Sequence, residues 1–313
     1  MENLATYKQQ VALLLEVLPI INEHKNFALK GGTAINLFVR DMPRLSVDID
    51  LTYLPIEDRN TSFNNIENTL RQIATQIQES SNHNYHIEEI LNKERRLDTL
   101  HVIDNNTRII VEVNHVVRGA VFGTEIRSLC RAAQDQFLTF CEVQTLSKAD
   151  LYGSKLCATL ARHKPRDLFD VMLLLKNEGI TEQIRQAFII YLASANRPIH
   201  ELLTTTPNLN NLEREFSTEL EGMAVGYNSI SILDLKNIMH NLIHEILNTM
   251  TDNERKFLLS IKLGQPDWTL LPINGINVLP ALQWKLKNIN NLKVADPEKY
   301  QDALYKLQKA LNV

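Results

Sequence analysis

The chain has 313 residues, of which 44% are hydrophobic, so it can bury a full core; this excludes a disordered protein and favours two domains. Its formal charge of −4 excludes the overall basic character of a dedicated nucleic-acid binder, so any contact with RNA or DNA has to be local. The 3 cysteines have no Cys-x-x-Cys spacing, which argues against a disulfide framework or a cysteine zinc site and is typical of cytoplasmic proteins.

The N-terminal residues, MENLATYKQQ, carry no signal pattern, and the longest apolar runs are too short to span a bilayer. We therefore expect a soluble protein that does not act at a membrane. Only 10 glycines and 10 prolines interrupt the chain, which favours a fold rich in helices with a modest amount of sheet.

Residues 3–23 repeat apolar side chains every three to four positions, which predicts an amphipathic helix interrupted near Pro19. The run FALK at 27–30 then predicts a short strand. A glycine pair ends this strand, and Thr33 is placed to cap a helix that ends by Arg40.

The glycine pair Gly31-Gly32 is the first candidate for a functional site. Glycines before a helix let backbone N–H groups approach a phosphate closely, and the helix N-terminus adds a positive partial charge. With Thr33, this turn is suited to binding the phosphates of a nucleotide.

Two aspartates, Asp48 and Asp50, lie in the alternating segment 46–53, which predicts a strand. Alternate residues of a strand point to one face, so both carboxylates lie side by side and can hold a divalent metal ion. Ser46 shares that face and is either a contact to metal or phosphate or a plain serine at the start of the strand. A phosphate-binding turn beside a metal site is what nucleotidyl transfer requires.

A helix is expected at 56–80, followed by a polar connector that leads into a short strand, and then by an antiparallel hairpin of strands 99–103 and 107–115. Its turn is the sequence Asp-Asn-Asn, which is typical of tight turns.

Glu112 lies inside the second strand of this hairpin, in the sequence IIVEVNHV. A carboxylate among apolar neighbours is costly to bury without a partner. Two interpretations stay open: an ion pair with an arginine such as Arg108 or Arg118, or a third metal ligand.

A long helical pattern begins at Leu146, where we expect the boundary between a domain of residues 1–145 and a helical domain of residues 146–313, and Pro165 divides this pattern into two helices.

Three cations, Lys148, Lys155 and Arg162, lie two helical turns apart and form one stripe along the first of these helices. A solvated face is the ordinary role of such charges. Lys155, however, lies among apolar residues, which favours a contact to phosphate.

Asp167 and Asp170 open the second helix. They either stabilise its N-terminus through the helix dipole, or at least one of them belongs to the functional site. The remaining residues, 181–313, are mainly helical in pattern and contain no established catalytic motif.

Several segments together resemble one protein family: KGGTAINLF, RLSVDIDL, IIVEVN, KLCATLARHKPRDLFDV and LPALQWKLKNI. The sequence resembles the AbiEii/AbiGii-type nucleotidyltransferase toxins of bacterial type IV toxin–antitoxin and abortive-infection systems, within the DNA polymerase β-like superfamily. The resemblance spans most of the chain.

The resemblance implies an α+β fold, with a polymerase β-like nucleotidyltransferase domain built on a small mixed sheet and followed by a largely helical C-terminal domain. It implies Mg²⁺ or Mn²⁺ as cofactor, an NTP as substrate, an RNA acceptor such as the 3′ end of tRNA, and an antitoxin protein as partner. The expected catalytic residues are Asp48, Asp50, Lys155, and Asp167 or Asp170; the expected nucleotide contacts are Gly31, Gly32, Thr33, Ser46, Lys148 and Arg162; and the expected metal ligands are Asp48, Asp50 and Glu112.

Two alternatives stay open. The enzyme could transfer the nucleotide to a protein or a small molecule, since the acidic composition gives no strong RNA signature. The second alternative is a regulator that binds a nucleotide without catalysis. A protein that only binds nucleotides, however, has no need of paired metal carboxylates.

Overall fold

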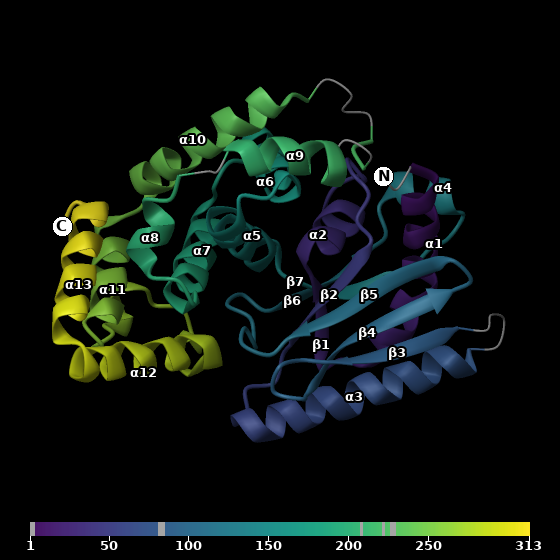
Figure 1. Cartoon of the computed structure of the whole chain (residues 1–313), viewed down its shortest axis with the longest axis horizontal. Coiled ribbons are helices and arrows are strands. Elements are labelled where there is room, and N and C mark those ends of the chain that lie inside the picture. Colours follow the sequence, from purple (N-terminus) through teal and green to yellow (C-terminus); the bar gives the residue numbers. More distant parts are fainter. Residues whose placement is uncertain (1–3, 81–84, 207–208, 221–222, 226–229) are drawn as a thin grey trace. The chain divides into compact units, whose positions relative to one another are not determined.

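The computed structural model describes residues 4–80, 85–206, 209–220, 223–225 and 230–313. The chain forms two compact units: unit 1 consists of Met1–Ser147 and Ser217–Ser229, and unit 2 of Lys148–Phe216 and Ile230–Val313 (Figure 1). The first limit lies close to the boundary that the sequence predicts. The assignment of Ser217–Ser229 to unit 1 has no counterpart in the sequence patterns.

Within the described part of the chain, unit 1 contains one seven-stranded mixed sheet in the order β3-β4-β5-β2-β1-β7-β6. β2 pairs with β5, and β1 with β7, in parallel, whereas the other neighbours are antiparallel. The expected mixed sheet is thereby confirmed. The strands are β1 (Phe27–Lys30), β2 (Asp48–Tyr53), β3 (His86–Leu91), β4 (Leu97–Asp104), β5 (Thr107–Asn114), β6 (Thr124–Ser128) and β7 (Glu142–Leu146).

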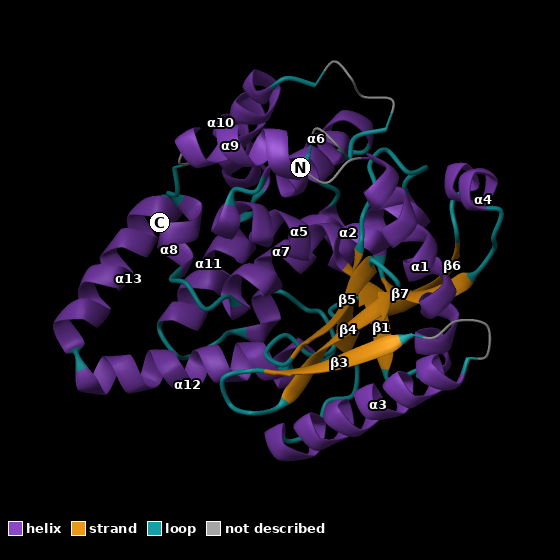
Figure 2. Ribbon diagram, turned by 45° about the vertical axis from the view of Figure 1, so that its right-hand side comes forward, coloured by secondary structure: helices purple, strands orange, loops and turns teal. Residues whose placement is uncertain are grey.

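Two long helices of unit 1, α1 (Leu4–Glu23) and α3 (Arg59–Glu79), contact each other and pack on the sheet (Figure 2). Every second side chain of β2 and β5 is completely buried, as Ile49 and Val111 are. The residues between them on both strands point to the opposite face of the sheet, and Asp48 and Asp50 are among these residues.

α1 is long and apolar enough to cross a membrane by length and composition, but its apolar residues, such as Val11 and Leu14, are buried in the core of unit 1. The predicted interruption at Pro19 is wrong, because the helix continues through it. Pro19 is exposed, so its ring faces outward, and burial of neighbours such as Leu18 compensates for the one missing hydrogen bond.

Between β1 and β2 the chain forms a short helix, α2 (Gly31–Ala34), that continues as a π-helical segment, Ile35–Val39. The loop that leads into β2 is paired with the segment that returns from the C-terminal half. The Leu45 N–H donates to the Met223 carbonyl oxygen, and the Val225 N–H donates to the Pro43 carbonyl oxygen, each at 2.8 Å. The start of the aspartate strand is therefore fixed by a segment nearly two hundred residues later in the chain.

The helical part of the sequence agrees with the expected pattern, and Pro165 separates α5 from α6 as predicted. Gly153 lets α5 approach α7 closely: a Cβ atom added there would lie 2.7 Å from both the Ala187 Cβ and the Phe188 nitrogen. The remaining helices are α4 (Arg131–Phe137), α5 (Lys148–Arg162), α6 (Pro165–Asn177), α7 (Glu182–Ser194), α8 (Ile199–Leu203), α9 (Leu209–Glu219), α10 (Ile232–Thr249), α11 (Asp252–Lys262), α12 (Pro280–Ala295) and α13 (Pro297–Leu311), with 3₁₀ turns at Trp268–Leu270 and Ile276–Val278.

Candidate active site

A row of polar side chains crosses the sheet of unit 1. Strand register pairs Asp50 with Lys30 on one side and with Glu112 on the other, and it pairs Glu112 with Thr99. Directly paired residues on neighbouring strands point to the same face, and Asp48, two positions before Asp50, shares it. The predicted carboxylates of β2 and β5 are therefore brought together in unit 1.

The carboxylates of this row repel one another. Glu112 is exposed, but its neighbours still desolvate the carboxylate and raise its pKa; the negative charge of Asp50 raises it further, while Lys30 acts in the opposite direction. In the described part of the structure, Glu112 forms no ion pair with either arginine that the sequence offered as its partner; Arg118 instead lies 5.6 Å from the centre of the Phe63 ring. A bound cation would relieve this repulsion.

Position 31 requires glycine for two reasons, its backbone conformation and its close neighbours. Its φ angle is +73°, a region that residues with a side chain rarely adopt. A Cβ atom at this position would lie 2.2 Å from the Asp50 Oδ2 atom. The backbone of the glycine turn therefore lies directly against one of the candidate metal ligands.

Gly32 packs as closely against the loop before β2. A Cβ atom there would lie 2.7 Å from the Arg44 Nη2 atom and 2.9 Å from the Ser46 Oγ atom. The Thr33 hydroxyl donates to the backbone oxygen of Asp48 at 2.5 Å and lies 3.1 Å from Ser46 Oγ. Thr33 therefore joins the glycine turn to the aspartate strand; it does not cap α2, which begins two residues earlier.

Two cations, Lys30 and Arg44, lie next to these residues and were not identified from the sequence patterns. Lys30 is set opposite Asp50 by the pairing of β1 with β2, and Arg44, 2% exposed, lies against Gly32 and donates to the Leu45 backbone oxygen at 3.0 Å. Lys30 could have been suspected, because it directly precedes the glycine pair. Arg44 carries no comparable signal.

A second cluster lies at the junction of α5 and α6 in unit 2. The Lys155 Nζ atom lies 2.8 Å from Asp167 Oδ1 and 3.0 Å from Asp170 Oδ2, and Arg162 Nη2 lies 2.8 Å from Asp167 Oδ2. Lys155, Asp167 and Asp170 are all buried. Burial alone would raise the pKa of Asp167, but Lys155 and Arg162 lower it below its usual value.

The predicted basic stripe of α5 is not a free basic surface. Lys148 lies 2.7 Å from a carboxylate oxygen of Glu178, while Lys155 and Arg162 are paired with the aspartates of α6. The contact of these cations with a nucleotide stays a prediction. Asp48, Asp50 and Glu112 belong to unit 1, and the α5–α6 cluster belongs to unit 2, so their combination in one site is likewise a prediction.

The donor set of unit 1 fits a hard cation. Carboxylate oxygens are the ligands that Mg²⁺ prefers, and one or two of them suffice when phosphates and water complete the shell. Among the described residues, no three His, Cys, Asp or Glu side chains form a group that could hold a metal ion. Asp48 and Asp50 have the chemistry of such ligands, but their role as metal ligands and that of Glu112 as a third ligand stay predictions.

Comparisons with known proteins identify the family of the chain. The family model described as "Nucleotidyl transferase AbiEii toxin, Type IV TA system" matches residues 12–288. MenT4, a nucleotidyltransferase toxin from Mycobacterium tuberculosis H37Rv, has a similar structure, with a TM-score of 0.60 and 11% sequence identity over 91% of this chain and 93% of that chain. No curated protein sequence matches. The chain belongs to the AbiEii family of nucleotidyltransferase toxins from type IV toxin–antitoxin systems.

Proposed function

We propose that this nucleotidyltransferase toxin moves a nucleotide from an NTP to an RNA acceptor, the 3′ end of tRNA, in a reaction that depends on Mg²⁺. One observation carries the proposal: the carboxylates of Asp50 and Glu112 lie side by side on neighbouring strands. Asp48 lies beside them, and Gly31 packs against Asp50. The resemblance of the sequence to its family points to tRNA as the acceptor.

In this proposal, Asp48 and Asp50 hold the metal ion, with Glu112 as a third carboxylate on the same face. Bound there, Mg²⁺ would neutralise charge on the NTP phosphates and favour the ionised acceptor hydroxyl. We assign the backbone N–H groups of Gly31 and Gly32 to the NTP phosphates, because the glycine turn lies directly against Asp50 and neither glycine has a side chain that could obstruct the approach of a phosphate.

The chemical step is an in-line displacement. The acceptor hydroxyl oxygen forms a bond to the α-phosphorus, and the bond from that phosphorus to the bridging oxygen breaks, so that pyrophosphate leaves with the negative charge. Fixed positive groups that face the leaving charge contribute most to such a step. We assign this role to Lys155, held by Asp167 and Asp170, with Lys148 and Arg162 as further phosphate contacts.

The family is one of toxin–antitoxin systems, which implies an antitoxin protein as partner. We propose that this partner suppresses the transfer reaction and that transfer to tRNA in its absence stops growth.

The experiment is to incubate the purified chain with each of the four NTPs, labelled at the α-phosphate, together with total RNA and Mg²⁺. Label is expected in RNA of tRNA size, and it should be lost when EDTA removes the metal. Label in protein would contradict the RNA acceptor but retain the transferase. Nucleotide binding without transfer under every condition would overturn the proposed reaction.

A further inference from the structure

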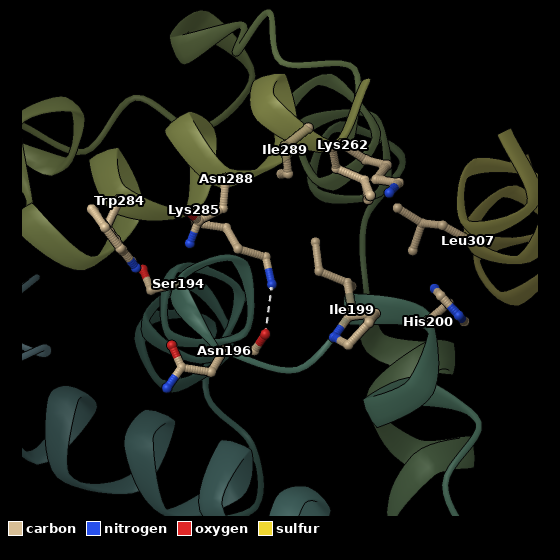
Figure 3. A pocket seen from close by; sticks show the side chains of 12 residues that line it. Ser194, Asn196, Ile199, His200, Lys262, Trp284, Lys285, Asn288, Ile289 and Leu307 are labelled. Carbon is tan, nitrogen blue, oxygen red and sulfur yellow. Dashed lines mark hydrogen bonds between the residues drawn. The ribbon is translucent and has the colours of Figure 1, made fainter. Parts of the chain in front are cut away.

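Unit 2 contains a cavity of about 170 Å³, and none of the residues that line it is assigned to the transfer reaction (Figure 3). It is bounded by residues at the end of α7 and in α8, α11, α12 and α13. None of the described residues that line it is Asp or Glu, whereas two are lysines. The lining consists of Ser194, Asn196, Pro198, Ile199, His200, Lys262, Trp284, Lys285, Asn288, Ile289, Leu292 and Leu307.

One of the two lysines, Lys285, donates hydrogen bonds to the backbone at the end of α7. Its ammonium group donates to the backbone oxygens of Ala195 at 2.5 Å and Arg197 at 2.8 Å, just beyond the C-terminal end of α7. The dashed line in Figure 3 marks its longer contact, at 3.5 Å, with the backbone oxygen of Asn196. Carbonyl groups at a helix end attract a cation. Burial, and after it the charge of Lys262, lower the pKa of Lys285 to about 8.

The other lysine, Lys262, has no such partner. Its side chain is 8% exposed, and within the described structure its ammonium group makes no hydrogen bond or ion pair; it lies 4.9 Å from the centre of the Tyr300 ring. Figure 3 shows its amino end beside His200 and Leu307. Burial lowers the pKa of Lys262. A buried cation without an anion is unfavourable, so an anion that enters the cavity would be attracted to Lys262.

The size and the walls of the cavity limit what can enter. A cavity of about 150 Å³ accommodates a benzene ring, whereas pockets for drug-sized ligands begin at about 300 Å³. A whole nucleotide is therefore too large. Apolar side chains of Ile199, Ile289 and Leu307 form much of the wall, so the body of the ligand should be apolar.

We infer that this cavity is a binding site for a small organic carboxylate, whose apolar body is no larger than a single ring and whose carboxylate group pairs with Lys262. The Lys262 ammonium group contacts the Tyr300 ring but has no anion beside it in the described structure, so it matches a ligand with one negative charge. Asn196 and Asn288 also line the cavity, and their side-chain amides can donate hydrogen bonds to polar atoms of the ligand. The site does not depend on the proposed transfer reaction. A ligand there touches the end of α7, which packs on the helix that carries Lys155.

Calorimetric titration of the full chain with three probes tests this inference: benzoate, its uncharged analogue benzamide, and inorganic phosphate. Benzoate should bind at least about tenfold more tightly than either of the others, since the site requires both a charge and an apolar body. Equal binding of benzoate and benzamide, or phosphate binding as tight as that of benzoate, would overturn it.

Two variants locate the binding. Lys262→Met keeps the length and apolar stem of the side chain but removes its charge, so the preference for benzoate over benzamide should disappear. Lys256→Met, on the exposed side of the same helix, is the matched control and should leave the preference intact. Leu292→Trp, at a partly exposed wall position, should block both ligands while the circular dichroism spectrum stays unchanged. Retention of the preference in Lys262→Met, or of benzoate binding in Leu292→Trp, would refute the site.

Discussion

Gly31 connects the conformation of one residue to the proposed chemistry. Its φ angle of +73° and the closeness of its Cα to the Asp50 carboxylate both exclude a side chain. The sequence suggests a glycine turn that leaves room for phosphate. The structure adds that the turn also fixes a candidate metal ligand, because Asp50 occupies the space where a Cβ atom would lie.

We expect Gly31→Ala to lower nucleotidyl transfer by at least about tenfold, because it displaces Asp50, and to reduce the free energy of unfolding by about 1 to 2 kcal/mol through the positive φ angle. Transfer rates and urea unfolding measure the two effects. Gly123→Ala is the matched control: its φ angle is +81°, but no atom lies within 4 Å of the added Cβ. It should lose stability and keep activity. Equal activity of both variants would disprove the role of the close contact.

Among the elements, the junction of α5 and α6 derives part of its stability from the ionised form of Asp167. The pKa of Asp167 is lowered in the folded protein, so its stabilising contribution is complete above the pKa of the unfolded chain, about 3.9, and is lost as the pH falls through the folded value. Below about pH 4, protonation of Asp167 should therefore favour unfolding.

Asp167→Asn should lower the free energy of unfolding at neutral pH by about 1 to 3 kcal/mol, because the buried Lys155 loses one of its two carboxylate partners and keeps only Asp170. Its unfolding temperature should also depend less on pH below about pH 4 than that of the wild type. Asp302→Asn removes an exposed ion pair with Lys306 and should change stability by less than about 0.5 kcal/mol. A pH dependence identical to that of the wild type would contradict the assignment to Asp167.

The contact between α5 and α7 gives a second prediction for an element. Gly153→Ala would ordinarily stabilise a helix by about 1 kcal/mol. Here we expect a loss of about 1 to 3 kcal/mol, because the new Cβ would lie 2.7 Å from the Phe188 nitrogen, which a side-chain rotation cannot relieve. Thermal unfolding of this variant beside Ser154→Ala, its neighbour on α5, measures the difference. A stabilised Gly153→Ala would show that the helices can separate at little cost.

The spacing of apolar residues predicted the elements in which that spacing is regular. The strand of Asp48 and Asp50 and the hairpin that carries Glu112 alternate clearly, and the structure confirms them. β6, Thr124–Ser128, was not predicted, because it is a mostly exposed edge strand without an apolar alternation. Its partner β7 runs directly into the helical pattern from Leu146, so no turn signal separates the two.

The candidate site could be predicted only in part, for a physical reason. Residue types and local spacing identified Gly31 and Asp50, but their contact depends on how β1 pairs with β2. The register that pairs Asp50 with Glu112 joins strands far apart in the sequence. Arg44 lies against Gly32 because a segment from the C-terminal half pairs with its loop, and no local pattern encodes such pairing.

At the scale of the whole molecule, the chain divides its predicted catalytic groups between two compact units. Unit 1 carries the carboxylate row and the glycine turn, and unit 2 carries the Lys155 cluster and the cavity with Lys262. The segment Ser217–Ser229 belongs to unit 1, although the residues on both sides of it belong to unit 2. The chain therefore passes between the units more than once.

Transfer of α-labelled nucleotide by wild type, Asp48→Asn and Asp50→Asn tests the central claim most directly. Asparagine preserves the shape of the side chain and removes its charge, so we expect both variants to fold normally and to lose transfer by at least about a hundredfold, about 3 kcal/mol of transition-state stabilisation. Glu125→Gln, on the edge strand of the same sheet, should retain full activity. A folded Asp48→Asn or Asp50→Asn protein that transfers nucleotide at the wild-type rate would contradict the account.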